Sequence, residues 1–557
     1  MPAQRDAPPA SFVEGLTTGR LPWERFAGFP EPGPEETAVT DALLSELGPL
    51  VDSWVDGDEI DRTREWPDGL LGRLREGGYF QLTAPPELGG HGLTPYALVR
   101  VAVRVARRSM SVGQMLCVQN GIAASALLPV TPPGPLRDLL RAEIAAGSIS
   151  GFADTDPAGQ NNTLSETTAE LTEDGSAYLL RGDKLFIANA GIAELIGVSA
   201  TVTEPGGPRA GVFFFRTGTP GFEVLAANDF IGMGALSSSI RLKGVRVPRE
   251  HALLGDASSR LPLPVALQGS YGRTAFAAVG SLAVIRNCLE YAAEFLGRRR
   301  IDGRGLADHD KIQRIVAATL ADEFAVESVT RWTLLDPGAE YDRAFETYAA
   351  KNLVTGLSWR ASDRVVGLLG GEGIETAQSK RRRGAVPHPA ERYHRDARAL
   401  RIVGNVDFVN DHRAGRMLLA RYLPGAGADR PVPEFPSAPL SVANRRHLAA
   451  VAGTFRRLDR ICRRLVARHP DPARLSERQE TVILVGRLAT ELFGVCAVLA
   501  RAAQDGGAPA QELADIHTTA ARHRLAGLVR RLTAGETTDS PDYAKVSHAW
   551  LTSLETR

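Results

Sequence analysis

Five short segments of this chain carry the residue types that could do chemistry. Glycine pairs let a backbone approach a ligand closely, and an arginine offers charge-assisted hydrogen bonds to a phosphate or carboxylate. Each segment alone is a weak signal, because a Gly-Gly-x-Gly pattern occurs by chance. The segments are the polar loop 155–161, the run 184–189 with one aromatic residue, the arginine run 298–300, the glycine-rich run 370–373 and the run 395–405.

Length and composition predict a globular protein of several domains. At about 100–200 residues per domain, the chain of 557 residues corresponds to roughly three to five units. It has 65 basic and 65 acidic residues, so its net charge favours neither nucleic acid nor an anionic membrane as a partner. The first 30 residues lack the apolar segment of a secretory signal, and Arg487 and Glu491 interrupt the apolar stretch 482–499. We therefore expect a cytoplasmic protein with no membrane span.

The four cysteines are far apart and lie in apolar helical patterns. Cysteine in such a pattern usually behaves as a small buried hydrophobe. No Cys/His spacing typical of a metal site occurs, so we expect no metal and no disulfide framework. The four are Cys117, Cys288, Cys462 and Cys496.

Hydrophobic periodicity predicts an α+β protein in the order helical, β, helical, helical. Apolar residues recur at three- and four-residue intervals in 43–51, whereas short β-rich runs alternate with turn residues between 149 and 254. Several prolines after residue 423 indicate a linker. The predicted units are an extended arm at 1–38, an N-terminal helical domain at 39–148, a middle β domain at 149–258, a helical bundle at 259–423, a linker at 424–440 and an extra C-terminal helical domain at 441–557.

In this order the motif-bearing segments resemble the acyl-CoA dehydrogenase family. Thr155 begins a loop where the family has Thr-Glu-Pro-x-Ala-Gly-Ser, and Lys184 begins a run where it has Lys-x-Trp-Ile-Thr-Asn. Residues 74–93, Arg299, the glycines at 370–373 and Arg395-Asp396-Ala397 complete six matches in register. The resemblance implies a helical N-terminal domain, a middle β-barrel domain, a C-terminal four-helix bundle and FAD as the cofactor.

A narrower resemblance concerns the two ends of the chain. Residues 11–21, followed by Phe29 and Pro30, are similar to the amino-terminal segment of very-long-chain acyl-CoA dehydrogenases. That subclass has an extra C-terminal helical domain, which 441–557 would supply, and it forms homodimers. The resemblance therefore implies a homodimer.

The family resemblance also assigns the cofactor site. Thr155 would donate to the N1/O2 edge of the flavin, Phe186 would cover one flavin face, and Arg299 would pair with the pyrophosphate of the partner subunit's FAD. Ala188 replaces a threonine whose hydroxyl reaches flavin N5, and this loses a hydrogen bond worth about 0.5–1.5 kcal/mol. The remaining positions are Asn161 on the phosphate-facing loop, Ile187 beside Phe186, and Gly370, Gly371 and Gly373 at the adenosine half.

The catalytic glutamate of the family is absent from both positions where relatives carry it. Gly404 stands where a glutamate follows the Arg-Asp-Ala run, and Gly272 stands where other relatives carry a glutamate before an arginine. That arginine is Arg273, which we expect to contact substrate. A base must sit over the substrate Cα, opposite the flavin. The remaining candidates are Asp407, Glu372, Tyr271 and a bound water.

Four interpretations of the vacant positions follow. In the first, another group is the base, and the protein is an FAD-dependent oxidoreductase of the acyl-CoA dehydrogenase type. In the second, the acyl thioester needs no strong base, and the protein performs a redox-neutral elimination or cyclisation of the cyclopropane-forming type with FAD as platform. The third is a monooxygenase that uses reduced flavin and oxygen. The fourth is a non-catalytic flavoprotein homologue.

The segment 379–384 is an addition relative to the family and is rich in basic residues. We interpret it as a docking patch for an acyl carrier protein, because such a patch speeds association by charge steering. Together with the vacant glutamate positions, it predicts an enzyme of a specialised biosynthetic pathway. Its substrate would be an acyl thioester on CoA or on a carrier protein.

Overall fold

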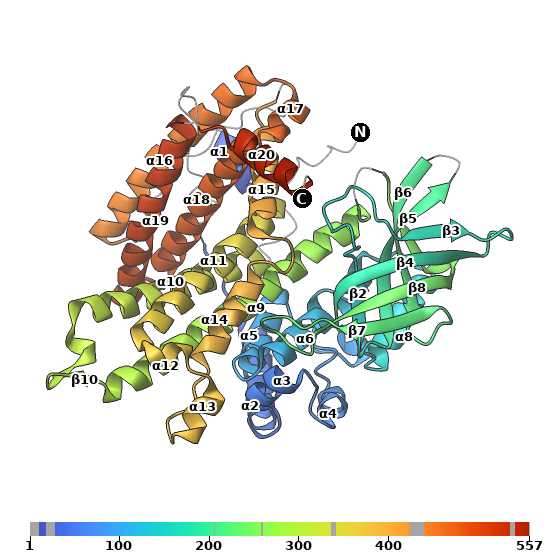
Figure 1. Ribbon diagram of the computed structural model, residues 1–557, viewed down its shortest axis with the longest axis horizontal. Helices are drawn as coiled ribbons and strands as arrows, with labels where there is room; N and C mark the ends of the chain where they lie inside the picture. The colour runs from blue at the N-terminus through green and yellow to red at the C-terminus, as the bar shows by residue number, and fades with distance from the viewer. Residues whose placement is uncertain are drawn as a thin grey trace.

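The computed structural model describes residues 10–17, 28–204, 207–257, 260–335, 341–423, 439–534 and 541–555. Over this part of the chain the predicted α+β fold with extra C-terminal helices is confirmed. In Figure 1 the β domain lies at one side of a long helical body, and the C-terminal helices lie at the opposite end. The N-terminal helices, drawn in blue, lie at the bottom of this view, below the place where the sheet meets the bundle.

The N-terminal helical domain packs two central helices, α5 (Pro95–Ala106) and α6 (Met110–Gly121), against the bundle. Helix α5 begins at a proline, and the Thr94 hydroxyl accepts a hydrogen bond from the backbone N–H of Ala97. Helix α6 is buried along nearly its whole length, as expected of a helix enclosed on all sides. The domain also contains α2 (Pro34–Trp54), α3 (Gly57–Thr63), α4 (Leu70–Glu76), α7 (Ala124–Leu127), α8 (Pro135–Ala145) and the 3-10 turns η2 (Pro86–Leu88) and η3 (Leu128–Val130).

The segment predicted as an extended arm contains a short strand and a helix in its described part. Strand β1 (Ala10–Ser11) pairs in parallel with β12 (Tyr341–Asp342), and α1 (Phe12–Thr17) follows it. The Phe12 ring is fully buried, and its centroid lies 5.7 Å from that of Phe345 and 5.5 Å from that of Phe493. Burial of this apolar turn stabilises a helix in a segment for which the Pro and Gly residues predicted an extended conformation.

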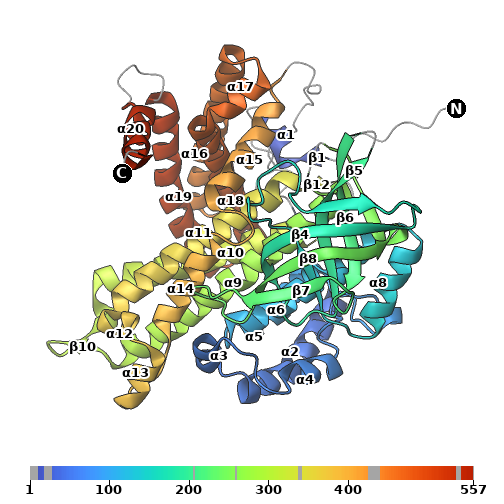
Figure 2. The same ribbon diagram turned by 45° about the vertical axis from the view of Figure 1, so that its right-hand side comes forward.

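The middle domain is one eight-stranded sheet in the order β7-β8-β4-β3-β5-β6-β9, with β2 paired to β5. Figure 2 shows β4, β8 and β7 side by side. Among the described residues no hydrogen-bonded ladder joins the edge strands β7 and β9, so the predicted barrel is an open sheet. The strands are β2 (Ser150–Ala153), β3 (Thr168–Leu171), β4 (Ala177–Ala188), β5 (Leu195–Glu204), β6 (Gly207–Arg216), β7 (Phe222–Ala227), β8 (Ser237–Pro248) and β9 (Ala252–Leu254), and the turn η4 (Arg249–His251) precedes β9.

The bundle is organised around α9 (Leu263–Arg298), which packs on α5, α6, α10, α11 and α14. Its central residues are almost all buried because it is covered on several sides. Its other elements are β10 (Arg300–Ile301), β11 (Arg304–Gly305), η5 (Leu306–Asp308), α10 (Asp310–Leu334), α11 (Ala344–Leu369), α12 (Gly371–Ile374), α13 (Ala377–Arg382), α14 (Ala390–Leu400) and α15 (Asp407–Ala420).

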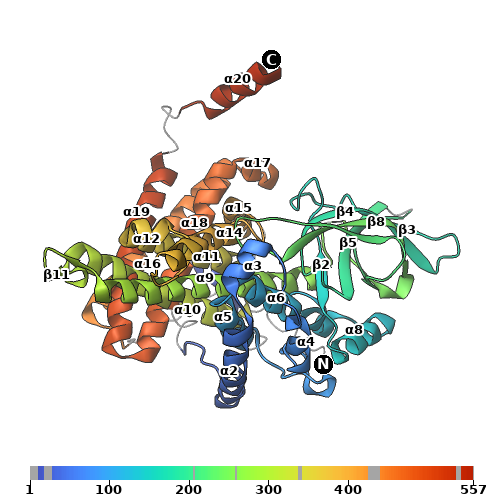
Figure 3. The ribbon, with the colours of Figure 1, turned by 60° about the horizontal axis from the view of Figure 1, so that its bottom comes forward.

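The C-terminal region continues the helical body. Helix α18 (Gln479–Asp505) packs on α15, α19 and α10. In the described chain it is the one helix long and apolar enough to cross a membrane, but 83% of its most apolar window is buried inside the protein. The other helices are α16 (Val442–Arg468), α17 (Pro472–Glu477), α19 (Ala508–Ala534) and α20 (Tyr543–Glu555), and α20 extends away from the rest in Figure 3. The four cysteines are free and buried, as predicted.

Candidate active site

Phe186 is a large aromatic side chain held at the surface by an irregular strand. It lies in β4, where the pairing with β8 contains a β-bulge. Ile187 follows Lys184 by three residues, but their partners on β8, Ser238 and Ile240, are only two residues apart. This bulge gives Phe186 a φ of 64°, and the side chain is 53% exposed. A non-glycine residue with positive φ inside a strand is uncommon, and bulges often redirect a side chain next to a functional site. Nothing in the residue pattern of this strand indicated the bulge.

The surface around Phe186 lies where the sheet meets the bundle. Phe230, in the loop between β7 and β8, places its ring centroid 5.6 Å from that of Phe186. Arg395 Nη1 donates to the carbonyl of Ile231 at 2.5 Å, and Asp396 Oδ1 accepts from the Met233 N–H at 3.2 Å. Burial raises the pKa of Asp396 to about 7. Arg395 and Asp396, which are consecutive residues of α14, therefore connect this helix to the β-domain loop beside Phe186.

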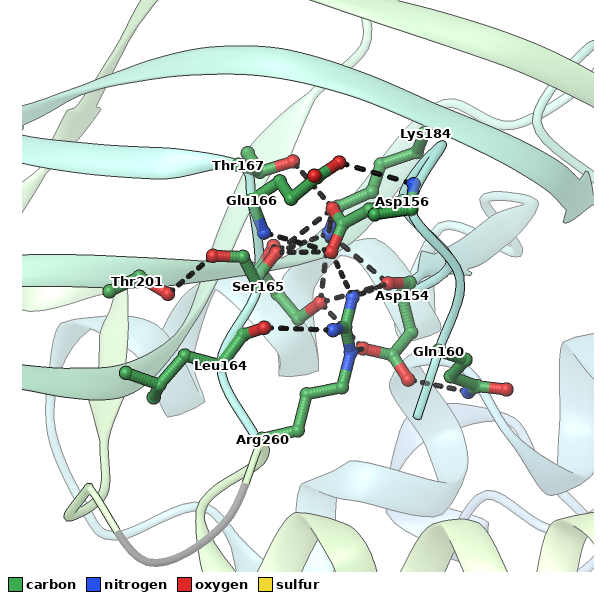
Figure 4. Close-up of polar contacts among 12 residues, drawn as sticks. Asp154, Asp156, Gln160, Leu164, Ser165, Glu166, Thr167, Lys184, Thr201 and Arg260 are labelled. Carbon is green, nitrogen blue, oxygen red and sulfur yellow. Dashed lines mark hydrogen bonds and ion pairs between the residues drawn. The ribbon is translucent and has the colours of Figure 1, made fainter. Parts of the chain in front are cut away.

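Thr155 is positioned by a network of four charged residues and their hydroxyl partners, shown in Figure 4. Lys184 is fully buried, and its Nζ lies 2.6 Å from Asp156 Oδ1 and 2.8 Å from Ser165 Oγ. Arg260 pairs with Asp156 and also with Asp154, where Nε lies 2.9 Å from Oδ1. The network thus balances two carboxylates with two cations.

The two aspartates on either side of Thr155 are held in place by this network. Burial works to raise the pKa of Asp156, but Lys184 and Arg260 hold it well below its usual range. The carbonyl of Thr155 accepts a hydrogen bond from the N–H of Leu185 at 2.8 Å, which places the loop next to Phe186. Sequence analysis singled out neither Arg260 nor Asp154 because Arg260 lies more than 100 residues from both aspartates.

The other predicted flavin-ring residues lie near Phe186 in the same domain. Ile187 is buried, whereas Ala188 is partly buried and pairs with Ser237 of β8. Asn161 is exposed on the loop after Thr155, and its Oδ1 lies 3.5 Å from Arg413 Nη2 of helix α15. The loop therefore faces the bundle. A flat ring lying on Phe186 would face the bundle as well.

A second group of predicted cofactor residues lies at the far end of α9. Arg299 is exposed at the end of this helix, and no hydrogen bond joins its guanidinium to the described residues. Gly370 and Gly371 are exposed, and an added Cβ on either would meet no atom within 4 Å, whereas one on Gly373 would meet the carbonyl of Val366. At 1.5 Å per residue, Arg299 is roughly 40 Å along α9 from Arg273. The predicted cofactor residues of one subunit therefore form two separate groups, one in the β domain and one at the far end of α9.

Neither vacant glutamate position has room for a side chain. A Cβ on Gly272 would lie 2.3 Å from the carbonyl oxygen of Gly121, because α9 packs there on the end of α6. Gly404 has a φ of 69°, and a Cβ there would lie 2.8 Å from Cγ of Arg273. The stem of Arg273 therefore occupies the space next to Gly404. Restoring a glutamate at 404 requires Arg273 to move and the backbone to accept strain.

Two arginines lie near the ring of Tyr348, and one of them, Arg273, also abuts Gly404. The Cζ atoms of Arg273 and Arg413 lie 5.4 and 5.8 Å from the centroid of its ring. Burial works to raise the pKa of Tyr348, but the charges of Arg273 and Arg413 and hydrogen bonds from Ser270 and Arg273 hold it below its usual value. Tyr348 and Arg413 are functional candidates that sequence reasoning missed, since neither belongs to a family motif.

Lys351 fixes the turn that contains Gly404. It is fully buried, and its Nζ donates to the carbonyl of Asn405 at 2.7 Å and to that of Arg401 at 3.1 Å. Burial lowers its pKa to about 7. We call Arg273, Tyr348, Lys351 and Arg413 the cationic cluster.

The three candidate bases have different surroundings. Asp407 forms an ion pair with Arg401, and although burial opposes it, this contact lowers the pKa of Asp407. Glu372 forms ion pairs with Arg298 and accepts a hydrogen bond from Tyr291 at 3.0 Å, at the far end of α9. The hydrogen bond from Arg298 is the main cause that lowers the pKa of Glu372. Tyr271 is partly buried and packs against the apolar core.

The basic segment 379–384 is largely used within the protein. Lys380 is fully buried and donates to the carbonyl of His388. Arg381 pairs with Asp58, and Arg383 pairs with Glu375. These contacts neutralise most of the predicted docking patch, since ion pairs leave little free charge to steer a partner.

Comparison with known proteins identifies the scaffold. The chain matches the acyl-CoA dehydrogenase N-terminal domain over residues 39–131, the middle domain over 151–245 and the C-terminal domain over 268–405. These matches together cover more than half of the 557 residues and follow the family's order. The chain belongs to the acyl-CoA dehydrogenase family. FAD is the cofactor of this family, as the resemblance implied.

Two curated relatives show how far the likeness in sequence extends. The chain is 30% identical over 417 residues to a probable acyl-CoA dehydrogenase, FadE10, of Mycobacterium tuberculosis, with 74% of this chain and 63% of the relative covered. It is 24% identical over 377 residues to the human mitochondrial very long-chain specific acyl-CoA dehydrogenase, covering 65% of this chain and 57% of that protein. The chain thus spans less than two thirds of the length of these relatives.

A solved structure extends the likeness to the C-terminal helices. An acyl-CoA dehydrogenase complexed with FAD from Bacillus anthracis has a TM-score of 0.76 at 17% sequence identity. The superposition covers 97% of this chain and 94% of that one. The helices that follow residue 441 therefore belong to the shared fold.

Proposed function

We propose that this protein is an FAD-dependent enzyme of the acyl-CoA dehydrogenase type that acts on an acyl thioester through a non-standard base. The observation that carries the proposal is the exposed Phe186, which a strand bulge holds beside Thr155 where the sheet meets the bundle. Bound FAD would supply a hydride acceptor. Phe186 would cover one flavin face and Thr155 would donate at the ring edge.

The base would be a group other than the usual glutamate. Of the three sequence candidates, Asp407 and Glu372 are paired with arginines, which makes them weak proton acceptors. Tyr271, which lies on α9 next to Gly272, stays a candidate. The acyl thioester would be bound to CoA or to a carrier protein, and an unusual base favours a specialised biosynthetic pathway over ordinary fatty-acid oxidation.

The active form would be a homodimer. Phe186 lies in β4, whereas Arg299 and Gly370 lie at the far end of the bundle, where α9 ends. Two subunits that exchange these two groups of residues would complete two FAD sites. We expect Arg299→Ala to weaken FAD binding in a homodimer while Thr155 and Phe186 stay in place, because the cation would act on the partner subunit's cofactor.

The first experiment measures FAD binding to the purified protein. Phe186→Ala should raise the dissociation constant for FAD by about tenfold or more, the equivalent of roughly 1.4 kcal/mol. The matched control is Phe408→Ala, since Phe408 is also about half exposed, at 52%, and lies at the start of α15. A colourless protein that takes up no added FAD would overturn the proposal.

A second candidate is redox-neutral elimination or cyclisation on an acyl thioester, with FAD as a platform. The observation in its favour is that the Arg273 stem and the Gly121 carbonyl occupy the space of both glutamate positions. Chemistry that starts with loss of a leaving group needs no strong base at Cα. Anaerobic turnover without an electron acceptor and without flavin bleaching would select this candidate, whereas one equivalent of flavin reduction per acyl group would select the dehydrogenase.

A further inference from the structure

The cationic cluster contains arginines that have no acidic partner. Among the residues that the structure describes, no carboxylate lies within ion-pair distance of Arg273 or Arg413. The same holds for the exposed Arg416, one turn further along α15. Most other partly buried arginines of the bundle are paired, such as Arg286 with Glu323 and Glu327.

This excess of positive charge borders a cavity of about 380 Å³. The cavity lies between α15 and the C-terminal helices α17 and α18, and Tyr348 lines it while also contacting Arg273. Arg413 and Arg416 provide its charged side, and Met417, Leu423 and Val482 are among its apolar walls.

A cluster of this kind is electrostatically incomplete. Burial lowers the pKa of the Arg273 guanidinium and the charge of Arg413 adds to this effect, whereas Tyr348 and the more distant Asp154 oppose it. A buried cation without an anion costs free energy, so an anionic ligand would bind favourably. The apolar walls fit a hydrocarbon chain better than a phosphate-bearing arm, which would need polar partners along its length.

We propose that the cationic cluster binds a carboxylate carried by the acyl group, so that the substrate is a dicarboxylic acid attached through one carboxyl as a thioester. Arg273 and Arg413 would hold the free carboxylate beside Tyr348. The proposal rests on the proposed function, because it takes an acyl thioester as the substrate.

The test compares matched thioesters on the FAD-loaded enzyme. Calorimetry on the anaerobic, dithionite-reduced enzyme measures binding without net oxidation of the ligand. The probes are mono-CoA thioesters of dicarboxylic acids of four to eight carbons, each against the neutral acyl-CoA of the same length, with CoA alone as a reference. At the best chain length, wild-type protein should bind the dicarboxylic thioester at least about tenfold more tightly, the effect of one hydrogen bond to a charged group.

Variants decide whether the cluster is responsible. Arg413→Gln should remove the preference, and Arg416→Gln should reduce it by a smaller factor. Arg398→Gln is the matched control, because Arg398 is exposed on α14 and has no side-chain contact with the cluster. A thermal melt of each variant confirms that it is folded, and the exposed Arg416 offers a substitution that leaves the core untouched.

Three results would overturn the inference. The first is equal binding of charged and neutral thioesters at every length, or no binding of either by the FAD-loaded enzyme. The second is a preference that Arg413→Gln leaves intact. The third is an equal loss of affinity for CoA alone in Arg413→Gln, because this would make a CoA phosphate the bound anion. Reduction of the flavin by neutral acyl-CoA would leave the proposed function standing, whereas a protein that cannot bind FAD would fail the proposed function itself.

Discussion

The β-domain network and the cationic cluster are built from the same kinds of charged side chains but differ in their balance. In the network, Lys184 and Arg260 meet Asp154 and Asp156, and every charge has an opposite charge within hydrogen-bond distance. In the cluster, Arg273 and Arg413 lie near the ring of Tyr348, and no carboxylate of the described residues lies within ion-pair distance of either guanidinium. Lys351 donates to backbone carbonyls instead of a carboxylate. The charges of the network balance one another and hold the loop around Thr155. The cluster has an excess of positive charge, which the proposed ligand would neutralise.

The largest expected effect comes from breaking the balanced network. Lys184→Met leaves Asp156 buried with only Arg260 as its cationic partner, and breaking a buried ion pair costs about 3–5 kcal/mol of the free energy of unfolding. Chemical denaturation measures this loss. Lys243→Met is the control, since its pair with Glu223 is exposed and should contribute at most about 1 kcal/mol. Equal losses in the two variants would show that the network is no more than a surface feature.

The second expected effect concerns the vacant position beside the cluster. Gly404→Glu should destabilise the protein by about 1–3 kcal/mol, because the residue adopts positive φ and its Cβ would press on Arg273. It should not create dehydrogenase activity toward neutral acyl-CoA. Denaturation and an anaerobic flavin-reduction assay on the same preparation check both statements. Gly367→Glu, at an open helical position, provides the control for a new carboxylate. Gain of activity in Gly404→Glu would mean that the Arg273 side chain moves away from residue 404 at little cost in free energy.

A third effect is the ionisation of Tyr348. Its pKa in the folded protein is lowered by Arg273 and Arg413, although burial opposes them. Because the folded pKa is depressed, the phenolate contributes stability above the unfolded pKa, and this is lost as pH falls through the folded pKa. Ultraviolet titration should show one tyrosine ionising before the others, and Tyr348→Phe should remove that step. An unchanged titration curve in the variant would exclude Tyr348 as the early group.

The smallest effect is expected in the cluster itself. Arg413→Gln removes one cation from a group that has an excess of them, so the free energy of unfolding should change by less than about 1 kcal/mol or increase. Denaturation of ligand-free protein measures it. A loss as large as that in Lys184→Met would mean that Arg413 is held by an acidic partner after all, and the contrast between the two regions would disappear.

Residue patterns predicted the order of the helical and β regions and identified some residues of the candidate site. Helical periodicity indicates helices because it depends on residues close together in the chain, and the spacing of the family motifs singled out Thr155, Phe186 and Gly404. The open sheet, the buried helix α1 and the bulge at Phe186 depend on tertiary packing instead. Local periodicity does not record such packing.

The sequence also did not predict which charged side chains contact one another. Arg260 meets Asp154 across about a hundred residues, and Arg273 meets Tyr348 across two helices of the bundle. The segment 379–384 was predicted to be a free basic patch because the sequence shows charges but not their partners. The structure pairs Arg381 with Asp58, more than 300 residues away. Charge balance is therefore a property of the folded protein, and it distinguishes a structural network from a binding site.

The most direct test of this account is the rate at which an acyl thioester bleaches the bound flavin in a single anaerobic turnover. We expect the flavin of the wild-type enzyme to be reduced at least about tenfold faster by a dicarboxylic mono-thioester than by the neutral thioester of equal length, for the best-fitting chain. Equal rates would contradict the role of the cationic cluster. Absence of bleaching by every thioester, in a protein that holds FAD, would contradict the dehydrogenase chemistry.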